Sequence, residues 1–231
     1  MNPFKLISSL NHDLRSPICT VNNLLYLLRR EMTDSSQLGM LEGIEAANDE
    51  IQDLLNNLLD FSKLQSGGLK PCMESFTLSE LISELRPKFK HQTQSKNILL
   101  SYMHPNDALM ELYGNKSQIV KTLHHILGLI ISISHYSQIS LDTEIKQSIH
   151  DKMLYFKVLF QGSTEDNTKL IEYFTQPDNS LIPSIPDSDM ELRLCLYDAF
   201  IKSLNGEITT CVFDPQTTHF IISIPLNSDN Q

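Results

Sequence analysis

Apolar residues recur every seven positions near the start of the chain, and this spacing limits the structures that the chain can form. The recurring set consists of Ile7, Leu14, Val21 and Leu28. A second set, which follows the first three members by four positions, consists of Asn11, Ile18 and Leu25. Such spacings put side chains on one face of an α-helix. The pattern therefore predicts a helix that runs to about Glu31 and has a mostly apolar seam, as in a bundle of helices.

A second helix is predicted from about Gln37 to Gln65. Its apolar seam consists of Ile44, Ala47, Ile51, Leu54, Leu58 and Phe61. The polar residues 33–36 suit a helix N-cap, and Gly67 and Gly68 suit a helix end. We therefore predict that residues 1–68 form a helical hairpin. Because a hairpin cannot bury both seams by itself, either pairing with a second copy as a dimeric four-helix bundle or packing against the rest of the chain would have to cover them.

His12 lies off the seam, on a polar face of the first predicted helix. The residues that share this face are Arg15, Ser16, Cys19, Asn22, Asn23 and Tyr26. An exposed imidazole can attack phosphorus when one ring nitrogen is free and the other is hydrogen-bonded. The adjacent Asp13 could orient the ring or accept its proton. The alternative is that His12 is an ordinary surface residue of a bundle helix.

Composition excludes several classes of partner. The net charge of −10 argues against binding to nucleic acid or to an anionic membrane surface, which both reward positive charge. No apolar run is as long as a membrane span, and no secretory signal is visible. The four cysteines are scattered without metal-ligand spacing, so we expect reduced thiols, a cytoplasmic location and no metal site. The adjacent His124 and His125 do not share a helix face, which favours a satisfied or a surface pair over a metal site.

The remaining residues, 69–231, alternate between helical and extended patterns. Helices are predicted over residues 78–89, 116–135 and 190–203. Strands are predicted over residues 97–103, 138–144, 152–160, 207–213 and 219–225, the last two forming a hairpin across residues 214–217. The predicted fold class is therefore α+β, in which the helical hairpin is followed by an α/β sandwich of one sheet with helices on one side.

The stretch Asn-His-Asp-Leu-Arg-Ser-Pro at residues 11–17 resembles the H-box of bacterial sensor histidine kinases, whose usual form is Ser-His-Glu-Leu-Arg-Thr-Pro. The resemblance implies that His12 is the phosphoacceptor and Asp13 its acidic neighbour. Ser16 stands at a position linked in the family to dephosphorylation of the partner. Residues 54–67 also resemble the end of the second dimerisation helix of these kinases, and the order of elements in 69–231 is similar to their ATP-binding domain.

The same resemblance implies partners. It implies a homodimer formed through the N-terminal hairpin and docking of response regulator receiver domains on it. We expect the receiver to contact the polar side chains near His12, which are Arg15, Cys19, Asn22, Asn23 and Tyr26.

Most nucleotide-binding motifs of the family are missing. At the positions of the N-box, which holds magnesium and phosphates, this chain has His125 and Leu129, and Ser132 stands where a basic residue is common. Leucine offers no oxygen to magnesium, a hard cation. Phe160 replaces the aspartate that reads adenine, although Gly162 is kept.

The family's glycine-rich turn is also lost. Glu191 and Arg193 replace glycines there, so a carboxylate would repel a triphosphate and side chains would block close approach of the backbone. These three losses predict that the second domain keeps the fold but does not bind Mg-ATP, and that the chain itself holds no cofactor.

Three functions fit this reading. The first is a histidine phosphotransferase of a phosphorelay, in which His12 takes a phosphoryl group from the aspartate of one receiver and passes it to another, with Mg²⁺ supplied by the receiver. Stand-alone dimeric proteins of this type are known in bacteria, and a chain without a sensor region before Met1 fits one, or a trimmed piece. The second is a divergent sensor kinase core that phosphorylates His12 from ATP. The third is a pseudokinase scaffold or a phosphatase for a response regulator.

Overall fold

The computed structural model describes residues 3–65, 71–103, 108–134, 138–147, 152–161, 189–214 and 217–226. Side chains are described over these ranges except at residues 3–12, 65, 133, 161, 189–190, 210–214 and 217–218. The chain divides into two units, which are described separately below. The first consists of Met1–Leu69 with Asp187–Leu192, and the second consists of Lys70–Pro186 with Arg193–Gln231.

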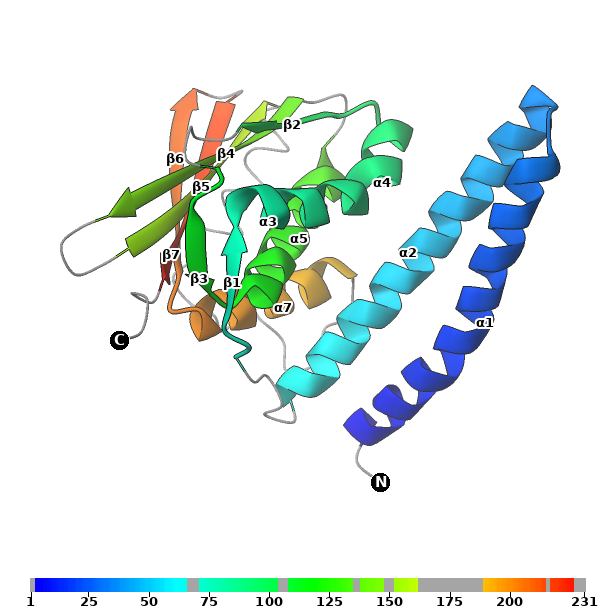
Figure 1. Ribbon diagram of the computed structural model, residues 1–231, viewed down its shortest axis with the longest axis horizontal. Helices are drawn as coiled ribbons and strands as arrows, with labels where there is room; N and C mark the ends of the chain where they lie inside the picture. The colour runs from blue at the N-terminus through cyan, green and yellow to red at the C-terminus, as the bar shows by residue number, and fades with distance from the viewer. Residues whose placement is uncertain are drawn as a thin grey trace. The chain divides into compact units, whose positions relative to one another are not determined.

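The first unit is a hairpin of two long helices, α1 (Pro3–Glu31) and α2 (Ser35–Gln65) (Figure 1). α2 starts two residues earlier than predicted because Asp34 caps it. Its Oδ1 accepts hydrogen bonds from the backbone amides of Ser36 and Gln37, at 2.9 and 3.0 Å. This cap provides partners for amides of the first helical turn that have none within the helix. The predicted helical hairpin is confirmed.

The second unit is built on a five-stranded sheet. Its strands are β2 (Leu99–Met103), β4 (Gln138–Gln147), β5 (Lys152–Gln161), β6 (Glu207–Asp214) and β7 (Thr217–Leu226). They lie in the order β2-β4-β5-β7-β6, and only the β2–β4 pair is parallel. The β6–β7 hairpin forms across residues 214–217 as predicted.

Helices cover one face of this sheet. They are α3 (Leu78–Leu85), α4 (Lys90–Ser95), α5 (Lys116–Ile133) and α7 (Asp189–Ser203). Burial alternates along β4 and β5, so one face of each strand is inside, as for Leu141 and Phe156. These side chains form one apolar core with α3 and with Leu123, Leu127 and Ile130 of α5. The predicted α+β fold with an α/β sandwich is confirmed.

The prediction of one sheet was incomplete. β1 (Glu74–Thr77) and β3 (Glu111–Gly114) form a separate antiparallel pair in which Phe76 stands opposite Leu112. Both side chains are buried. Each strand has only four residues, which is too short for an alternating pattern to stand out from the sequence.

The helix predicted over residues 78–89 is also divided. A capping box between Thr77 and Glu80 starts α3, which ends at Leu85. A 3₁₀ turn, Arg86–Phe89, follows, and α4 comes directly after it. Pro87 has no amide hydrogen, so it cannot continue the α-helical hydrogen-bond ladder and a tighter turn forms in its place. Within the described ranges, no helix combines the length and apolar content that crossing a membrane requires.

Candidate functional site

α1 carries the predicted phosphoacceptor, but the side chain of His12 lies outside the described residues. Its neighbours are described. Asp13, Arg15 and Ser16 are all exposed. On a helix, residues three and four positions apart are surface neighbours, so Arg15 and Ser16 lie beside position 12. The Ser16 carbonyl accepts a hydrogen bond from Thr20 Oγ1 at 3.1 Å. The roles assigned to His12, Asp13 and Ser16 stay predictions.

The five residues predicted to contact a receiver do not all lie on one open surface. Arg15, Cys19, Asn23 and Tyr26 are exposed, and the Arg30 guanidinium lies 5.9 Å from the centre of the Tyr26 ring. Asn22 differs, because it is half-buried and its Oδ1 accepts a hydrogen bond from Asn48 Nδ2 at 2.5 Å. Asn22 therefore faces α2, and any contact with a receiver would have to compete with Asn48.

The hairpin leaves a stripe of large apolar side chains uncovered. Six of them, at seven-residue spacing on each helix, are Leu14, Val21 and Leu28 of α1 and Ile44, Ile51 and Leu58 of α2. Each is at least 38% exposed. We call these six residues the apolar stripe. Exposed apolar side chains repeated in this way usually mark an interaction surface.

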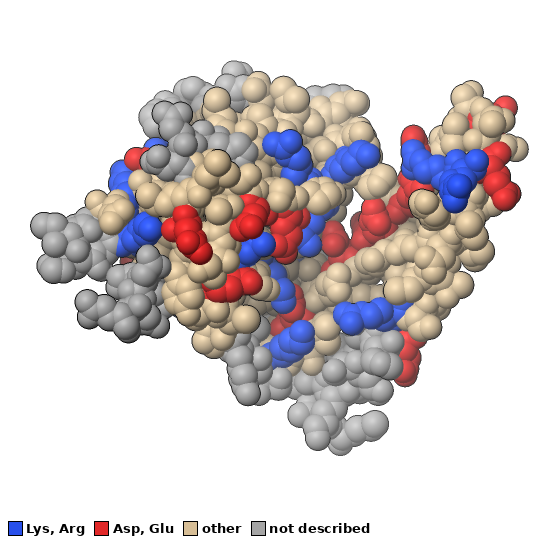
Figure 2. All heavy atoms as spheres, viewed as in Figure 1, with Lys and Arg blue, Asp and Glu red and all other residues tan. Residues whose placement is uncertain are grey.

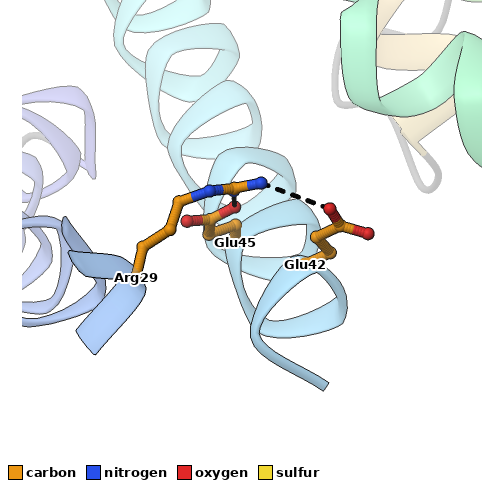
Figure 3. A network of polar contacts seen from close by, with 3 residues as sticks. All are labelled: Arg29, Glu42 and Glu45. Carbon is orange, nitrogen blue, oxygen red and sulfur yellow. Dashed lines mark hydrogen bonds and ion pairs between the residues drawn. The ribbon is translucent and has the colours of Figure 1, made fainter. Parts of the chain in front are cut away.

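Charged side chains gather near the turn of the hairpin, where Figure 2 shows basic groups on α1 beside acidic groups. Arg29 of α1 binds two carboxylates of α2 (Figure 3). Its Nη2 donates to Glu42 Oε1 at 3.2 Å, and its Nη1 donates to Glu45 Oε2. These ion pairs join the two helices of one chain.

The residues predicted at the N-box and at the glycine-rich turn lie on α5 and α7. His125, at the predicted N-box position, is 2% exposed, and its ring stacks on Phe200 of α7 with centroids 5.5 Å apart. The neighbouring His124 stacks on Phe89 at 5.3 Å and meets His125 edge-on at 5.6 Å. We call these four rings the ring stack. Both histidines are buried, so the surface alternative of the prediction is wrong, and the two ring nitrogens of His125 have no hydrogen-bond partner among the described residues, so that ring is not satisfied either.

Burial also sets the charge of the two histidines. Desolvation, helped by the nearby positive charges of Arg193 and Lys88, lowers the pKa of His124 to about 3. Desolvation lowers the pKa of His125 well below its ordinary value, with further contributions from His124, Arg193 and Lys121. Both rings are therefore neutral at physiological pH and offer no cation to a phosphate.

Two further positions that the resemblance assigns to nucleotide-binding motifs, Leu129 and Arg193, also carry buried side chains. Leu129, one turn after His125, is 1% exposed, whereas Ser132 is exposed. Arg193 is 5% exposed, and its Nη1 lies 2.7 Å from the point that a Cβ on Gly128 would occupy. A guanidinium thus fills the space beside the backbone of α5. The sequence showed that Arg193 replaces a glycine, but it could not show where the side chain lies.

Phe160 stands where the resemblance implies an aspartate that reads adenine. It is fully buried in β5 opposite Ile139 of β4, so it belongs to the core. Glu191 is half-buried near the start of α7. Gly162 and residues 163–188, which include the predicted lid, lie outside the described residues.

Comparisons with known proteins agree with the resemblance seen in the sequence. Residues 5–67 match the family described as the His Kinase A (phospho-acceptor) domain. The chain is 23% identical over 227 residues to the sensor histidine kinase GacS of Pseudomonas protegens, covering 96% of this chain and 24% of GacS. It is 26% identical over 214 residues to the hybrid signal transduction histidine kinase L of Dictyostelium discoideum, covering 88% of this chain and 12% of that protein. The chain thus spans a quarter or less of the length of these two relatives.

The fold is similar to that of the Acinetobacter baumannii histidine kinase AdeS, with a TM-score of 0.55 and 19% identity. That match covers 94% of this chain and 98% of the solved one. At this identity the match shows the fold alone. The predicted resemblance to a histidine kinase core is confirmed for the hairpin and for the fold of the domain that follows.

Proposed function

We propose that this chain, which has the phosphoacceptor hairpin and the ATPase-like fold of a histidine kinase core, works as a histidine phosphotransferase in two-component signalling. His12 takes a phosphoryl group from the aspartyl phosphate of one receiver domain and passes it to the aspartate of another. ATP takes no part. The observation that supports this proposal is the burial of His125, Leu129 and Arg193, which stand at positions where the resemblance implies motifs that hold Mg-ATP.

The transfer balances without a further reactant. A ring nitrogen of His12 attacks the phosphorus, the bond from phosphorus to the aspartate oxygen breaks, and the carboxylate leaves with its electron pair. The product is a phosphoramidate on His12. In the second step a carboxylate oxygen of the next receiver attacks the phosphorus, and the bond to the His12 nitrogen breaks. Asp13, the next residue in the sequence, would hold the proton of the other ring nitrogen. Mg²⁺, which we expect the receiver to carry, would neutralise charge on the phosphoryl oxygens.

Transfer from ATP depends mostly on positioning and on neutralising charge with metal and hydrogen-bond donors. Here the two N-box positions carry a buried neutral imidazole and a buried leucine, His125 and Leu129. Neither provides the hard oxygen ligands that Mg²⁺ prefers. The described parts of α5 and α7 therefore favour a phosphotransferase over a kinase.

A divergent kinase core is the second candidate, because the curated relatives reported above are named as histidine kinases. The two candidates differ in the source of the phosphoryl group, so one labelling experiment can separate them.

We also propose that the chain is a homodimer through its hairpin. The apolar stripe supports this, since six large apolar side chains at seven-residue spacing remain exposed in one copy. Pairing two hairpins would cover them in a four-helix bundle.

The test of the proposed function uses a panel of receiver domains phosphorylated with radiolabelled acetyl phosphate. Label should move to the wild-type chain and to the control variant His91→Gln, which keeps a histidine at position 12. It should not move to His12→Gln. In a parallel sample, radiolabelled Mg-ATP should leave the wild type unlabelled, and calorimetric titration up to millimolar nucleotide should give no binding heat. Label from ATP on His12 would instead establish the kinase, and no label from either source would favour a scaffold.

A further inference from the structure

Two polar connections between α1 and α2 bear on how the hairpin is built, one of them partly buried and the other exposed. One is the hydrogen bond from Asn48 Nδ2 to Asn22 Oδ1, in which Asn48 is 6% exposed. The other, seven residues further along α1, is the bridge from Arg29 to Glu42 and Glu45 (Figure 3). We call the interface between α1 and α2 the inner seam, and it also contains the buried Leu25 and Leu41.

Asn48 stands at a position where the spacing of α2 would suit an apolar residue. Leu41 precedes it by seven residues and Leu55 follows it by seven, and Leu41 is 2% exposed. A buried amide in place of leucine is unfavourable unless its polar atoms find partners. Asn22 is that partner in the observed register, and its own position is half-buried.

The apolar stripe has no such residue. All six of its members are aliphatic, and all six are exposed in the single chain. The hairpin therefore has two seams of different chemistry, one marked by polar pairs and closed within the chain, and one purely apolar and open.

We propose that Asn22 and Asn48, assisted by Arg29, are positioning residues that fix the register of α1 on α2. In this register the apolar stripe stays exposed and can bind the second copy. If α1 slipped by one heptad, Asn48 would face position 15 or 29 in place of Asn22. The Asn22 amide would then face Leu41 or Leu55 and lose its hydrogen bond. A buried polar pair selects one register in helical bundles because each alternative leaves an amide unpaired, whereas two apolar seams would be interchangeable.

This inference deepens the proposed function and rests on it for one of its readouts. The register decides which residues of α2 flank the polar face of α1 that carries Arg15, Cys19 and Tyr26. A shifted register would present a different surface beside His12 to a receiver domain.

The test compares Asn22→Leu, Asn48→Leu and the double variant with wild type and with a matched control, Asn56→Leu, whose position on α2 is exposed. Each single variant of the inner seam should lower the thermal midpoint of the hairpin by roughly 4–8 °C, because one amide is left buried without a partner. The double variant should recover the wild-type midpoint or exceed it, as expected when both polar partners of a buried pair become apolar.

Sedimentation velocity and receiver labelling complete the test. Wild type and control should sediment as one dimeric species, whereas the inner-seam double variant should populate additional assemblies. Its labelling by a phosphorylated receiver should be at least tenfold slower. A double variant that sediments as one dimer with wild-type labelling would overturn the proposal. If wild type itself takes no label, the proposed function fails, and the register is still judged by the midpoints and by sedimentation.

Discussion

At the scale of single residues, the contact between Gly128 and Arg193 shows how closely α5 and α7 approach each other. The Nη1 atom of Arg193 lies 2.7 Å from the ideal Cβ position of Gly128, and Arg193 is almost fully buried. A methyl group at position 128 would have to displace this guanidinium, which is the end of a flexible but almost fully buried side chain. Glycine is thus favoured by a side chain from another helix, although the helix itself would be more stable with alanine.

This contact leads to a prediction with an internal control. Gly128→Ala should lower the free energy of unfolding by about 1–2 kcal/mol, because the cost of moving Arg193 exceeds the gain in helix propensity. Gly39→Ala in α2 should instead raise it by up to about 1 kcal/mol, since a Cβ there meets no atom within 4 Å. Urea denaturation followed by circular dichroism measures both. Equal effects of the two substitutions would contradict the close approach.

The residues of the candidate site differ in how well the sequence could predict them. His12 is recognisable because its motif is contiguous, and the motif losses at His125, Leu129 and Arg193 are visible against the family pattern. The pairing of Asn22 with Asn48 was not predicted, and Asn22 was assigned to the receiver face. The sequence does single out Asn48, because it interrupts a series of apolar residues at seven-residue spacing between Leu41 and Leu55. Its partner could not be identified, because the two residues lie on different helices.

At the scale of elements, the apolar stripe predicts the behaviour of the hairpin in solution. Ile51 is 50% exposed in one chain and would be covered in the proposed bundle. Ile51→Glu should therefore raise the dissociation constant of the dimer at least 100-fold, because a carboxylate would be buried without a partner. The control Asn56→Glu places the same charge at another exposed position of α2 and should leave the dimer intact. Sedimentation equilibrium distinguishes them, and a dimer that survives Ile51→Glu would place the interface elsewhere.

Elements with long periodic patterns were predicted well, and elements defined by distant partners were not. α1, α2 and α5 follow from local spacing, and the β6–β7 hairpin follows from its short turn. β1 and β3 have four residues each and exist because Phe76 and Leu112 meet across a gap of more than 30 residues of sequence. α4 lies beyond the helix predicted over residues 78–89 and was missed because it buries no residue and so has no apolar pattern.

At the scale of the whole molecule, the two units should respond differently to acid. In the folded second unit His124 and His125 are neutral, since burial lowers both pKa values. In the unfolded chain they bind protons below about pH 6.5. The second unit therefore has its full stability above that pH and loses it as the pH falls toward 3, the folded pKa of His124, by up to about 1.4 kcal/mol per pH unit for each histidine.

This pH dependence can be measured by denaturant titrations at pH 7.5, 6.5 and 5.5. His125→Phe keeps a ring against Phe200 and removes one titrating group, so the slope of stability against pH should be about half that of wild type. A variant at the exposed position of Ser132, Ser132→Ala, should keep the wild-type slope. Identical slopes for His125→Phe and wild type would mean that the pKa of His125 does not differ between the folded and unfolded states.

The strand order has a consequence for how the molecule is made. β7 is the last of the described strands in the sequence, yet it lies inside the sheet, between β5 and β6. During synthesis, the second edge of β5 therefore stays unpaired until residues 217–226 have been made. The hairpin is formed by two helices that are consecutive in the sequence, so it can form much earlier, as local structure generally does. On the ribosome, two nascent hairpins could meet through the apolar stripe while the sheet is still open, so dimerisation could precede completion of the second unit.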